Sequence, residues 1–231
     1  MFRQQWQAQA ASLAKKVGAL KRACDALKSS EDLIGVLTTV LSVGNLLNKG
    51  TRRGGSKGFT IQSLAKLVSV KAADGSSLLD YIASVYVKKK QTSTGVEDAA
   101  PAPRSSSSRG GGGRGRGRTG AGLVVPELAL AANVATSDLA SDLRSLQRGL
   151  AELQAELAAE PPRDTHDWRA FDVTCASTVG TIATLERETQ ASIVAALAFF
   201  KADEESIGEF LPRMHAFIVD FNRACAKQQR A

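Results

Sequence analysis

Apolar residues recur at helical spacing over most of the chain. Five of them near the start are separated alternately by four and three positions, which places them on one stripe of a helix, with Trp6 one heptad earlier. This stripe consists of Leu13, Val17, Leu20, Cys24 and Leu27. Ser30, followed by Glu31 and Asp32, is typical of a helix start. The helix that begins there is expected to end near residues 48–50, where Asn and Gly occur.

Glycines interrupt the pattern at residues 50–58 and predict a loop. Asp74 and Gly75 predict a turn, after which Ser76 or Ser77 can cap another helix. Between the loop and the turn, apolar spacing predicts a short helix that contains Phe59, Ile61, Leu64 and Leu67.

A long heptad pattern follows Pro126, a residue that favours the first turn of a helix. Leucines and alanines repeat at spacings of four and three over residues 128–157, which predicts one helix of roughly 50 Å. A proline pair at 161–162 ends it, and a further helix is expected over 164–200. The short connection favours an antiparallel hairpin over a dimer. A last helix, bent near Pro212, is indicated by Phe210, Met214, Phe217, Phe221 and Cys225.

Residues 88–122 break these patterns. The segment lacks apolar periodicity and is rich in Gly, Ser and Arg, so it cannot repay the entropy of ordering. We expect a flexible basic insertion of net charge +6 between residues 1–87, with net charge +7, and residues 123–231, with net charge −6. Opposite charges let the two outer parts attract each other, or let the basic part face an acidic partner, such as an actin filament, a nucleic acid or an acidic membrane surface.

Composition excludes several classes of protein. At 43% hydrophobic residues the chain can bury a core, but no apolar run is long enough to span a membrane. No secretory signal is visible, and the cysteines do not form a Cys-x-x-Cys zinc site or a disulfide framework. The chain therefore reads as an intracellular, soluble, all-α protein without a metal. Its three cysteines are expected to lie on helix seams.

The search for catalytic chemistry gives no candidate. The two histidines, His166 and His215, lack partners in any recognisable catalytic or metal-binding arrangement. The loop at 50–58 lacks the Gly-Lys-Ser/Thr ending of a phosphate-binding loop and follows a helix rather than a strand. We therefore expect neither an enzyme nor a cofactor.

The Gly/Arg tract invites a nucleic-acid interpretation. Arg109, Arg114, Arg116 and Arg118 are interleaved with glycines, and such tracts bind RNA through phosphate contacts and guanidinium stacking. No aromatic residue accompanies the tract, so a soluble basic linker is the competing interpretation. Salt-sensitive RNA binding that vanishes on deletion of residues 104–118 would support the RNA-binding interpretation over the linker interpretation.

Residues 44–79 carry one long and specific signature. It resembles the formin homology 2 domain, whose pattern is Gly-Asn-x-x-Asn, a Gly/Arg loop, Gly-Phe-x-Leu-x-x-Leu-x-Lys-Leu, then Lys and Leu-Leu. Ile61 replaces the usual Leu, and the end of the chain, from Phe199 to Ala224, also resembles the end of that domain. The matching positions are Gly44-Asn45-Leu46-Leu47-Asn48, Gly50, Arg52-Arg53-Gly54, Gly58-Phe59, Leu64, Lys66-Leu67, Lys71, Asp74 and Leu78-Leu79.

The resemblance implies a fold, partners and site residues. In the family this region belongs to the post, which receives the lasso of a partner subunit, and the ring-like dimer nucleates actin filaments and moves with their barbed ends. The lasso-accepting, dimer-forming positions would be Gly44, Asn45, Asn48, Gly50, Gly58 and Phe59. The positions facing actin would be Arg52, Arg53, Lys57, Lys66 and Lys71.

The same residues also have a plain structural interpretation. Asn45 and Asn48 at a helix end can satisfy orphan carbonyls or hold the following loop, and glycines allow sharp turns. The basic residues would then form a solvated face.

The match covers about the second half of the family domain. Lasso, linker and knob are not visible, so a truncated chain is expected. We expect an elongated helical module with post-like residues 1–87, a disordered insertion at 88–122 and the remaining long helices at 123–231. Its function would be actin assembly in the cytoplasm and cytoskeleton. The alternatives are a scaffold or decoy that captures the lasso of another formin, and an RNA-associated helical protein.

Overall fold

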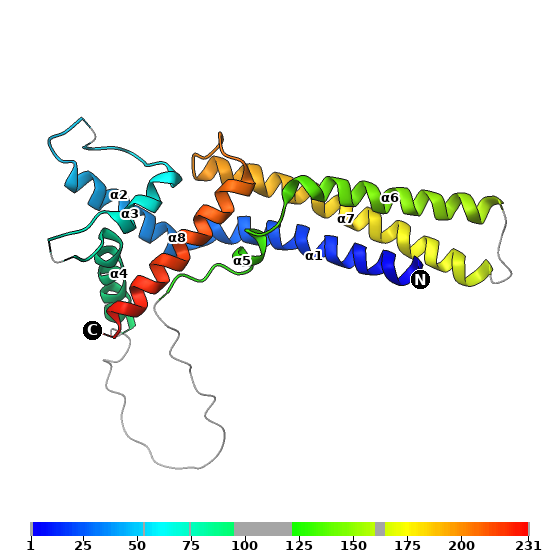
Figure 1. Ribbon diagram of the computed structural model, residues 1–231, viewed down its shortest axis with the longest axis horizontal. Coiled ribbons are helices and arrows are strands. Elements are labelled where there is room, and N and C mark those ends of the chain that lie inside the picture. Colours follow the sequence, from blue (N-terminus) through cyan, green and yellow to red (C-terminus); the bar gives the residue numbers. More distant parts are fainter. Residues whose placement is uncertain (1, 53, 74, 95–121, 160–164, 231) are drawn as a thin grey trace, which may run out of the picture. The chain divides into compact units, whose positions relative to one another are not determined.

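The computed structural model describes residues 2–52, 54–73, 75–94, 122–159 and 165–230. These residues form helices and connecting turns, and their only β-type pairing is an isolated bridge between Lys71 and Ser77 (Figure 1). The helices are α1 Phe2–Ser29, α2 Glu31–Leu47, the 3₁₀ turn η1 Ile61–Ala65, α3 Lys66–Ser69, α4 Leu78–Thr94, α5 Leu128–Ala131, α6 Thr136–Ala159, α7 Thr165–Phe199 and α8 Ile207–Gln228. The all-α expectation is therefore confirmed.

The chain divides into two compact units. Unit 1 contains Met1–Ser30 and Val125–His215, and unit 2 contains Glu31–Val124 and Ala216–Ala231. Helix α8 contributes its first turns to unit 1 and its remainder to unit 2. Among the described residues, no single helix is both long enough and apolar enough to cross a membrane.

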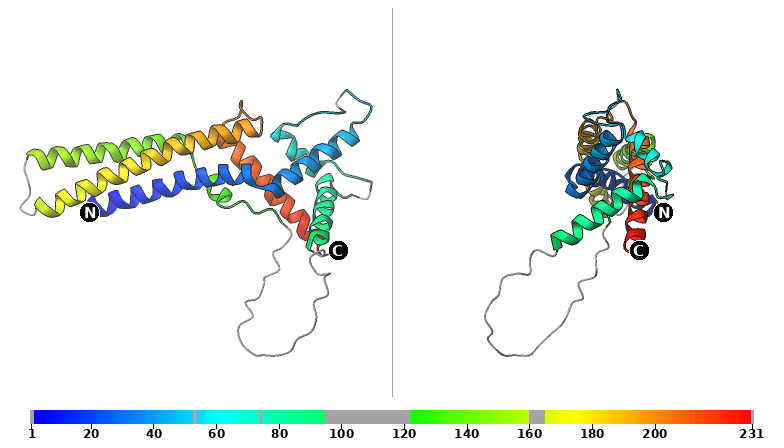
Figure 2. Two further views of the ribbon diagram at one scale, coloured as in Figure 1. Left: turned by 180° about the vertical axis from the view of Figure 1, so that it is seen from behind. Right: turned by 90° about the vertical axis from the view of Figure 1, so that its left-hand side faces the viewer.

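Unit 1 is a bundle in which α1, α6 and α7 lie side by side (Figure 2). The α1 residues that the heptad predicted are buried, from Trp6 and Leu13 to Leu20 and Leu27. Trp6 packs edge-on against Phe171 of α7, with ring centroids 6.1 Å apart. Its indole N–H donates to the Leu146 carbonyl of α6 over 3.5 Å. Such contacts fix the register of the three helices.

The predicted antiparallel hairpin is present in this bundle. Gln154 of α6 donates to Asp172 of α7 over 2.9 Å, across a chain reversal of eighteen residues. Helices α1 and α7 run parallel to each other, as Figure 1 shows. Their first turns meet where Arg3 of α1 lies 2.6 Å from Asp167 of α7. The proline pair at 161–162 lies outside the described residues.

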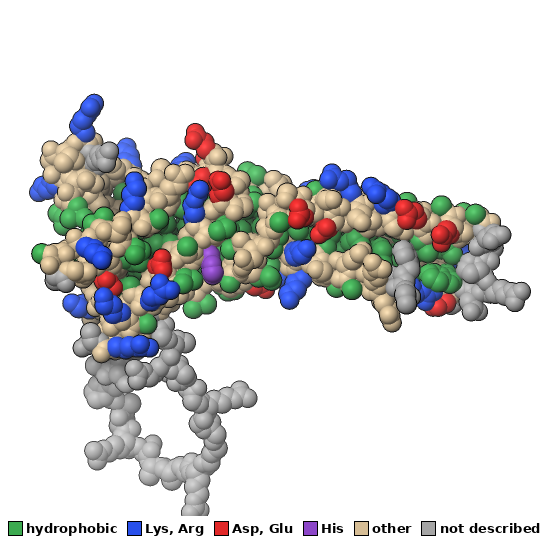
Figure 3. Space-filling view, viewed as in Figure 1, with side chains coloured by type: hydrophobic (Ala, Val, Ile, Leu, Met, Phe, Trp, Pro, Cys, Tyr) green, Lys and Arg blue, Asp and Glu red, His purple; other side chains and the backbone are tan. Residues whose placement is uncertain are grey.

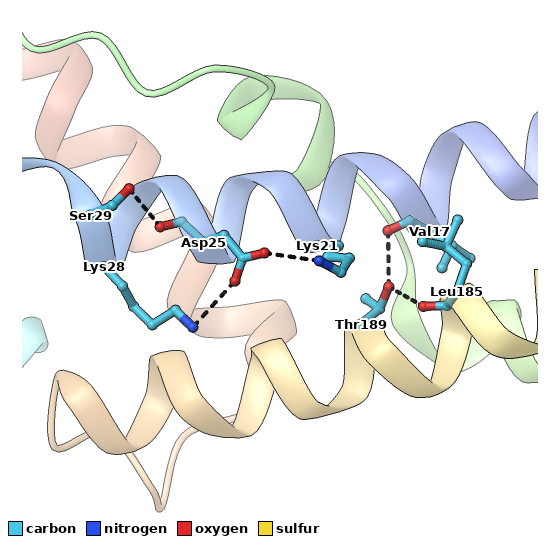
Figure 4. Close-up of polar contacts among 7 residues, drawn as sticks. All are labelled: Val17, Lys21, Asp25, Lys28, Ser29, Leu185 and Thr189. Atoms are coloured by element: carbon cyan, nitrogen blue, oxygen red, sulfur yellow. Dashed lines mark hydrogen bonds and ion pairs between the residues drawn. The ribbon is translucent and has the colours of Figure 1, made fainter.

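Polar contacts lie both between α1 and α7 and within α1 (Figure 4). The buried Thr189 hydroxyl lies 2.7 Å from the Leu185 carbonyl and 3.4 Å from the Val17 carbonyl. On α1, the ammonium groups of Lys21 and Lys28 each lie 3.2 Å from the Asp25 carboxylate. Burial acts to raise the pKa of Asp25, but hydrogen bonds from these lysines and from Ser192, together with the charge of Lys21, outweigh it and lower that pKa.

The prediction of one continuous helix over residues 128–157 is wrong, because two helices cover this range. Helix α5 ends at Ala131 and α6 begins at Thr136, so the seam is broken between them. The Asn133 amide donates to the Ala129 carbonyl over 2.7 Å and satisfies an orphan acceptor at the end of α5. This polar side chain thus stabilises a helix end where the heptad pattern alone predicts continuation.

The predicted flexible insertion begins earlier in the sequence than the structure allows. Helix α4 continues through residues 88–94, where Lys and Gln favour helix, and Lys90 pairs with Asp32 at 2.8 Å. At the other end, Gly122 packs against Asn222 of α8. Residues 95–121 lie outside the described residues.

Candidate functional site

The end of α2 and the loop after it are held together by one side chain. The Asn45 amide donates to the Ser56 carbonyl over 2.8 Å, and its carbonyl oxygen accepts from the Ser56 backbone N–H over 2.8 Å. These two bonds close a loop of eleven residues onto the last turns of the helix. The structural role proposed for Asn45 as a holder of the loop therefore matches this geometry.

Within the loop, the backbone at Thr51 and Gly54 lies close to the Asn48 carbonyl. The Asn48 carbonyl accepts from the backbone N–H of Thr51 over 3.0 Å and from its hydroxyl over 2.8 Å. A Cβ on Gly54 would lie only 2.6 Å from this carbonyl oxygen, so only glycine fits without a shift. Gly50 and Gly55 have φ of +83° and +76°, which other residues rarely adopt.

A groove of about 290 Å³ opens beside this loop within unit 2. It combines apolar side chains with the half-buried side chains of Asn45, Asn48 and Ser63 and the exposed Ser56, a mixture usual for sites that bind peptide or small molecules. Helix α2 supplies one wall, and the loop, η1, α3 and the first residue of α4 supply the rest. The lining residues are Val40, Leu41, Gly44, Asn45, Asn48, Ser56, Gly58, Phe59, Ser63, Leu67 and Leu78.

Most of the predicted lasso-accepting positions meet at this groove. Five of the six line it, and Gly50 lies instead at the sharp turn after α2. Sequence reasoning had not assigned Val40 or Leu41 to the site. Their helical spacing from Gly44, Asn45 and Asn48 is a signal that could have found them.

The predicted actin-facing cations lie outside the groove lining. Arg52, Lys57, Lys66 and Lys71 are exposed, and none of them forms an ion pair with another described residue. Arg53 lies outside the described residues. Blue side chains are visible at the upper left of Figure 3, where Figure 1 shows the loop after α2.

The start of α4, which brings Leu78 to the groove, is fixed by a capping box. The Asp80 carboxylate accepts from the Ser77 backbone N–H over 2.9 Å and from its hydroxyl over 2.8 Å, while the Ser77 hydroxyl accepts from the Asp80 N–H over 3.1 Å. Lys227 of α8 lies 3.3 Å from the same carboxylate. The backbone hydrogen bond from Ser77 is the main reason that the pKa of Asp80 lies below its usual value.

A second depression in unit 2, of about 200 Å³, separates α2 from α4. Asp32 and Lys90 pair at its rim, and burial together with the nearby Asp32 carboxylate raises the pKa of Tyr86 to about 12. Tyr86 packs edge-on against Phe221 at 5.4 Å. These contacts join helices of the unit. Over the described ranges, no three His, Cys, Asp or Glu side chains gather in a way that could hold a metal ion.

Comparison with known proteins identifies the family. The family model for the Formin Homology 2 Domain matches residues 1–222. Human protein diaphanous homolog 3 is 24% identical over 234 residues, covering 97% of this chain and 17% of the relative. Mouse formin-2 is 32% identical over 148 residues, 63% of this chain and 8% of the relative. Formin-like protein 13 of Arabidopsis thaliana is 34% identical over 89 residues, which cover 38% of this chain and 7% of the relative.

The chain thus spans less than a fifth of the length of each of these relatives. The matched region includes every helix of both units up to Asn222, and it includes the groove with its signature loop. The chain belongs to the Formin Homology 2 Domain family.

Proposed function

We propose that this chain acts in actin filament assembly, with the groove beside Asn45 receiving the lasso of a formin-type partner subunit. The observation that carries the proposal is that five of the six positions implied by the family resemblance line a single groove. Its apolar wall and the polar side chains beside it suit an extended peptide segment. The cellular site of this activity is the actin cytoskeleton.

The charge of unit 2 supports an acidic filament as the partner. Between Asp32 and Asp74 the sequence contains six Lys or Arg residues and no Asp or Glu. The positive potential of such a surface raises both the rate and the strength of association with an acidic protein. Nucleation and barbed-end elongation are the activities that the proposal assigns to the dimer.

Filament cosedimentation tests the contribution of the cations. The Lys66→Glu, Lys71→Glu double variant is expected to weaken cosedimentation with filamentous actin about tenfold or more, and more strongly at low salt. Lys15→Glu, at an exposed lysine of unit 1, is the matched control and is expected to leave binding unchanged. Equal cosedimentation of the double variant and the wild type would contradict the assigned actin-facing role.

Binding of a synthetic formin lasso peptide tests the groove. Asn45→Ala with Asn48→Ala is expected to abolish peptide binding, whereas Gln190→Ala, at an exposed position of α7, is expected to leave it unchanged. Retained binding to the double variant would refute the assignment of the groove.

A scaffold or decoy function is the second candidate. It is favoured by one observation, that residues of unit 2 alone form the whole described lining of the groove. A decoy captures the lasso without assembling filaments. Peptide binding without actin cosedimentation or accelerated pyrene-actin polymerisation would therefore select it over the first candidate.

A further inference from the structure

Two leucines protrude from the end of α2 outside the groove. Leu46 is 69% exposed and Leu47 is 62% exposed, and neither contributes to the groove lining. Large apolar side chains at such exposure gain little from the fold itself. Both side chains are therefore free to enter an apolar environment supplied from outside the chain.

Basic residues share this end of the helix with the leucines. The Lys49 backbone N–H donates to the Leu46 carbonyl over 3.2 Å. Ser56, which precedes Lys57, is bonded to Asn45, which precedes Leu46. The loop therefore returns Lys57 to the neighbourhood of the leucines. We call residues 45–52 and 54–57 the α2 tip.

No acidic side chain of the local sequence neutralises the α2 tip. The acids nearest in sequence, Asp32 and Asp74, lie well outside it. Asp32 is paired with Lys90 at 2.8 Å, at the opposite end of α2. Lys49, Arg52 and Lys57 are exposed and form no ion pair among the residues that the structure describes.

The exposed side of α2 extends the apolar character of the tip. The hydroxyls of Thr38 and Ser42 donate to the Ile34 and Thr38 carbonyls of their own helix over 2.8 and 2.9 Å. Because these hydroxyls are already bonded, the side chains present their carbon atoms to the surroundings at little desolvation cost. The helix carries no charged residue after Asp32.

Protruding leucines flanked by cations form the pattern by which peripheral proteins enter the interface of an anionic bilayer. The apolar side chains enter the boundary between headgroups and acyl chains, while Lys and Arg remain at the level of the negative headgroups. A peptide partner would be met by a concave surface, and the concave surface of this region is the groove, which does not include the leucines. We propose that the α2 tip is a docking surface for anionic lipid membranes.

Vesicle cosedimentation of the full chain tests this proposal. The protein is expected to sediment with phosphatidylcholine vesicles containing 30% phosphatidylserine, and to remain in solution with phosphatidylcholine alone. The Lys49→Gln, Lys57→Gln variant is expected to bind about 25-fold more weakly, at about fivefold for each cation. Leu46→Ser with Leu47→Ser is expected to weaken binding by about tenfold or more, because the leucines no longer enter the interface.

A matched control distinguishes insertion of the leucines into the membrane from a general effect of replacing exposed apolar residues. Val173→Ser with Val194→Ser alters two valines of α7 that are 68% and 58% exposed, and vesicle binding is expected to stay at the wild-type level. Far-UV circular dichroism is expected to be the same for all variants, since every substituted side chain is exposed.

Three results would overturn the proposal. They are absence of binding to the anionic vesicles, binding that is unchanged in the leucine variant, and loss of binding in the α7 control to the same extent. Binding to soluble polyglutamate without binding to vesicles would assign the tip to an acidic protein instead. These outcomes are independent of the lasso-peptide assay, because the substituted residues do not line the groove.

Discussion

Two glycines of the groove region should respond to alanine in opposite ways. At Gly54 the new Cβ would lie 2.6 Å from the Asn48 carbonyl oxygen, so the loop must move by several tenths of an ångström. Overpacking of this kind costs about 1–3 kcal/mol. At Gly44, inside α2, the new Cβ would have no neighbour within 4 Å, and alanine favours helix over glycine by about 0.8–1 kcal/mol. The two substitutions therefore differ by roughly 2–4 kcal/mol in local stability.

Hydrogen exchange at the Ser56 amide measures this difference directly, because that amide donates to the Asn45 side chain. In Gly54→Ala it should exchange about 5- to 150-fold faster, which corresponds to 1–3 kcal/mol. In Gly44→Ala it should exchange at the wild-type rate or more slowly. Equal exchange in the wild type and Gly54→Ala, with an unchanged thermal midpoint, would refute the close approach of the backbone at this site.

Further predictions concern the loop, acid stability and the thiols. Asn45→Ala removes both bonds to Ser56 and should accelerate exchange of that amide about tenfold or more, whereas exchange in α7 stays unchanged. Asp80 has a lowered pKa in the folded state, so its stabilisation is complete above about pH 4 and is lost as the pH falls through the folded pKa. Acid unfolding followed by circular dichroism should thus be less steep in Asp80→Asn, and identical curves would contradict this role. Burial raises the pKa of both Cys24 and Cys225 to about 11, so a thiol reagent at pH 8 should label them only in denaturant.

The sequence predicted elements whose stability comes from local chemistry or regular burial. Trp6, Leu13, Leu20 and Leu27 repeat every seven residues, and all are buried in unit 1. Ser77 was one of two candidates for the cap of α4, and its side chain forms the capping box. In these cases the spacing or side-chain chemistry leaves few alternatives.

Features that depend on particular distant contacts escaped prediction. The heptads did not reveal the interruption after α5, which Asn133 stabilises by a bond to the Ala129 carbonyl. The extension of α4 to Thr94 involves Lys90 and Asp32, which are 58 residues apart. Apolar periodicity records burial, and neither of these polar contacts changes it.

The sequence predicted the glycines and asparagines of the candidate site, but it did not predict which neighbouring apolar residues are exposed. The family pattern indicated Asn45 and Phe59, and both line the groove. The exposure of Leu46 and Leu47 was not foreseen, because the same pattern is compatible with a buried last turn of α2. The groove lining includes Gly44, Asn45 and Asn48 but neither of these leucines.

The packing of α1 against α6 and α7, which are synthesised much later, has a consequence for biosynthesis. Trp6 contacts Leu146, which is 140 residues later in the chain, and Arg3 contacts Asp167, 164 residues later. At 5–20 residues per second, the ribosome needs roughly 7–30 s to supply these partners. During that interval the apolar stripe of α1 has no native cover, because α1 is synthesised before α6 and α7. Chaperone binding to nascent chains should therefore be strongest before α7 is complete, and it should fall once α7 has been synthesised.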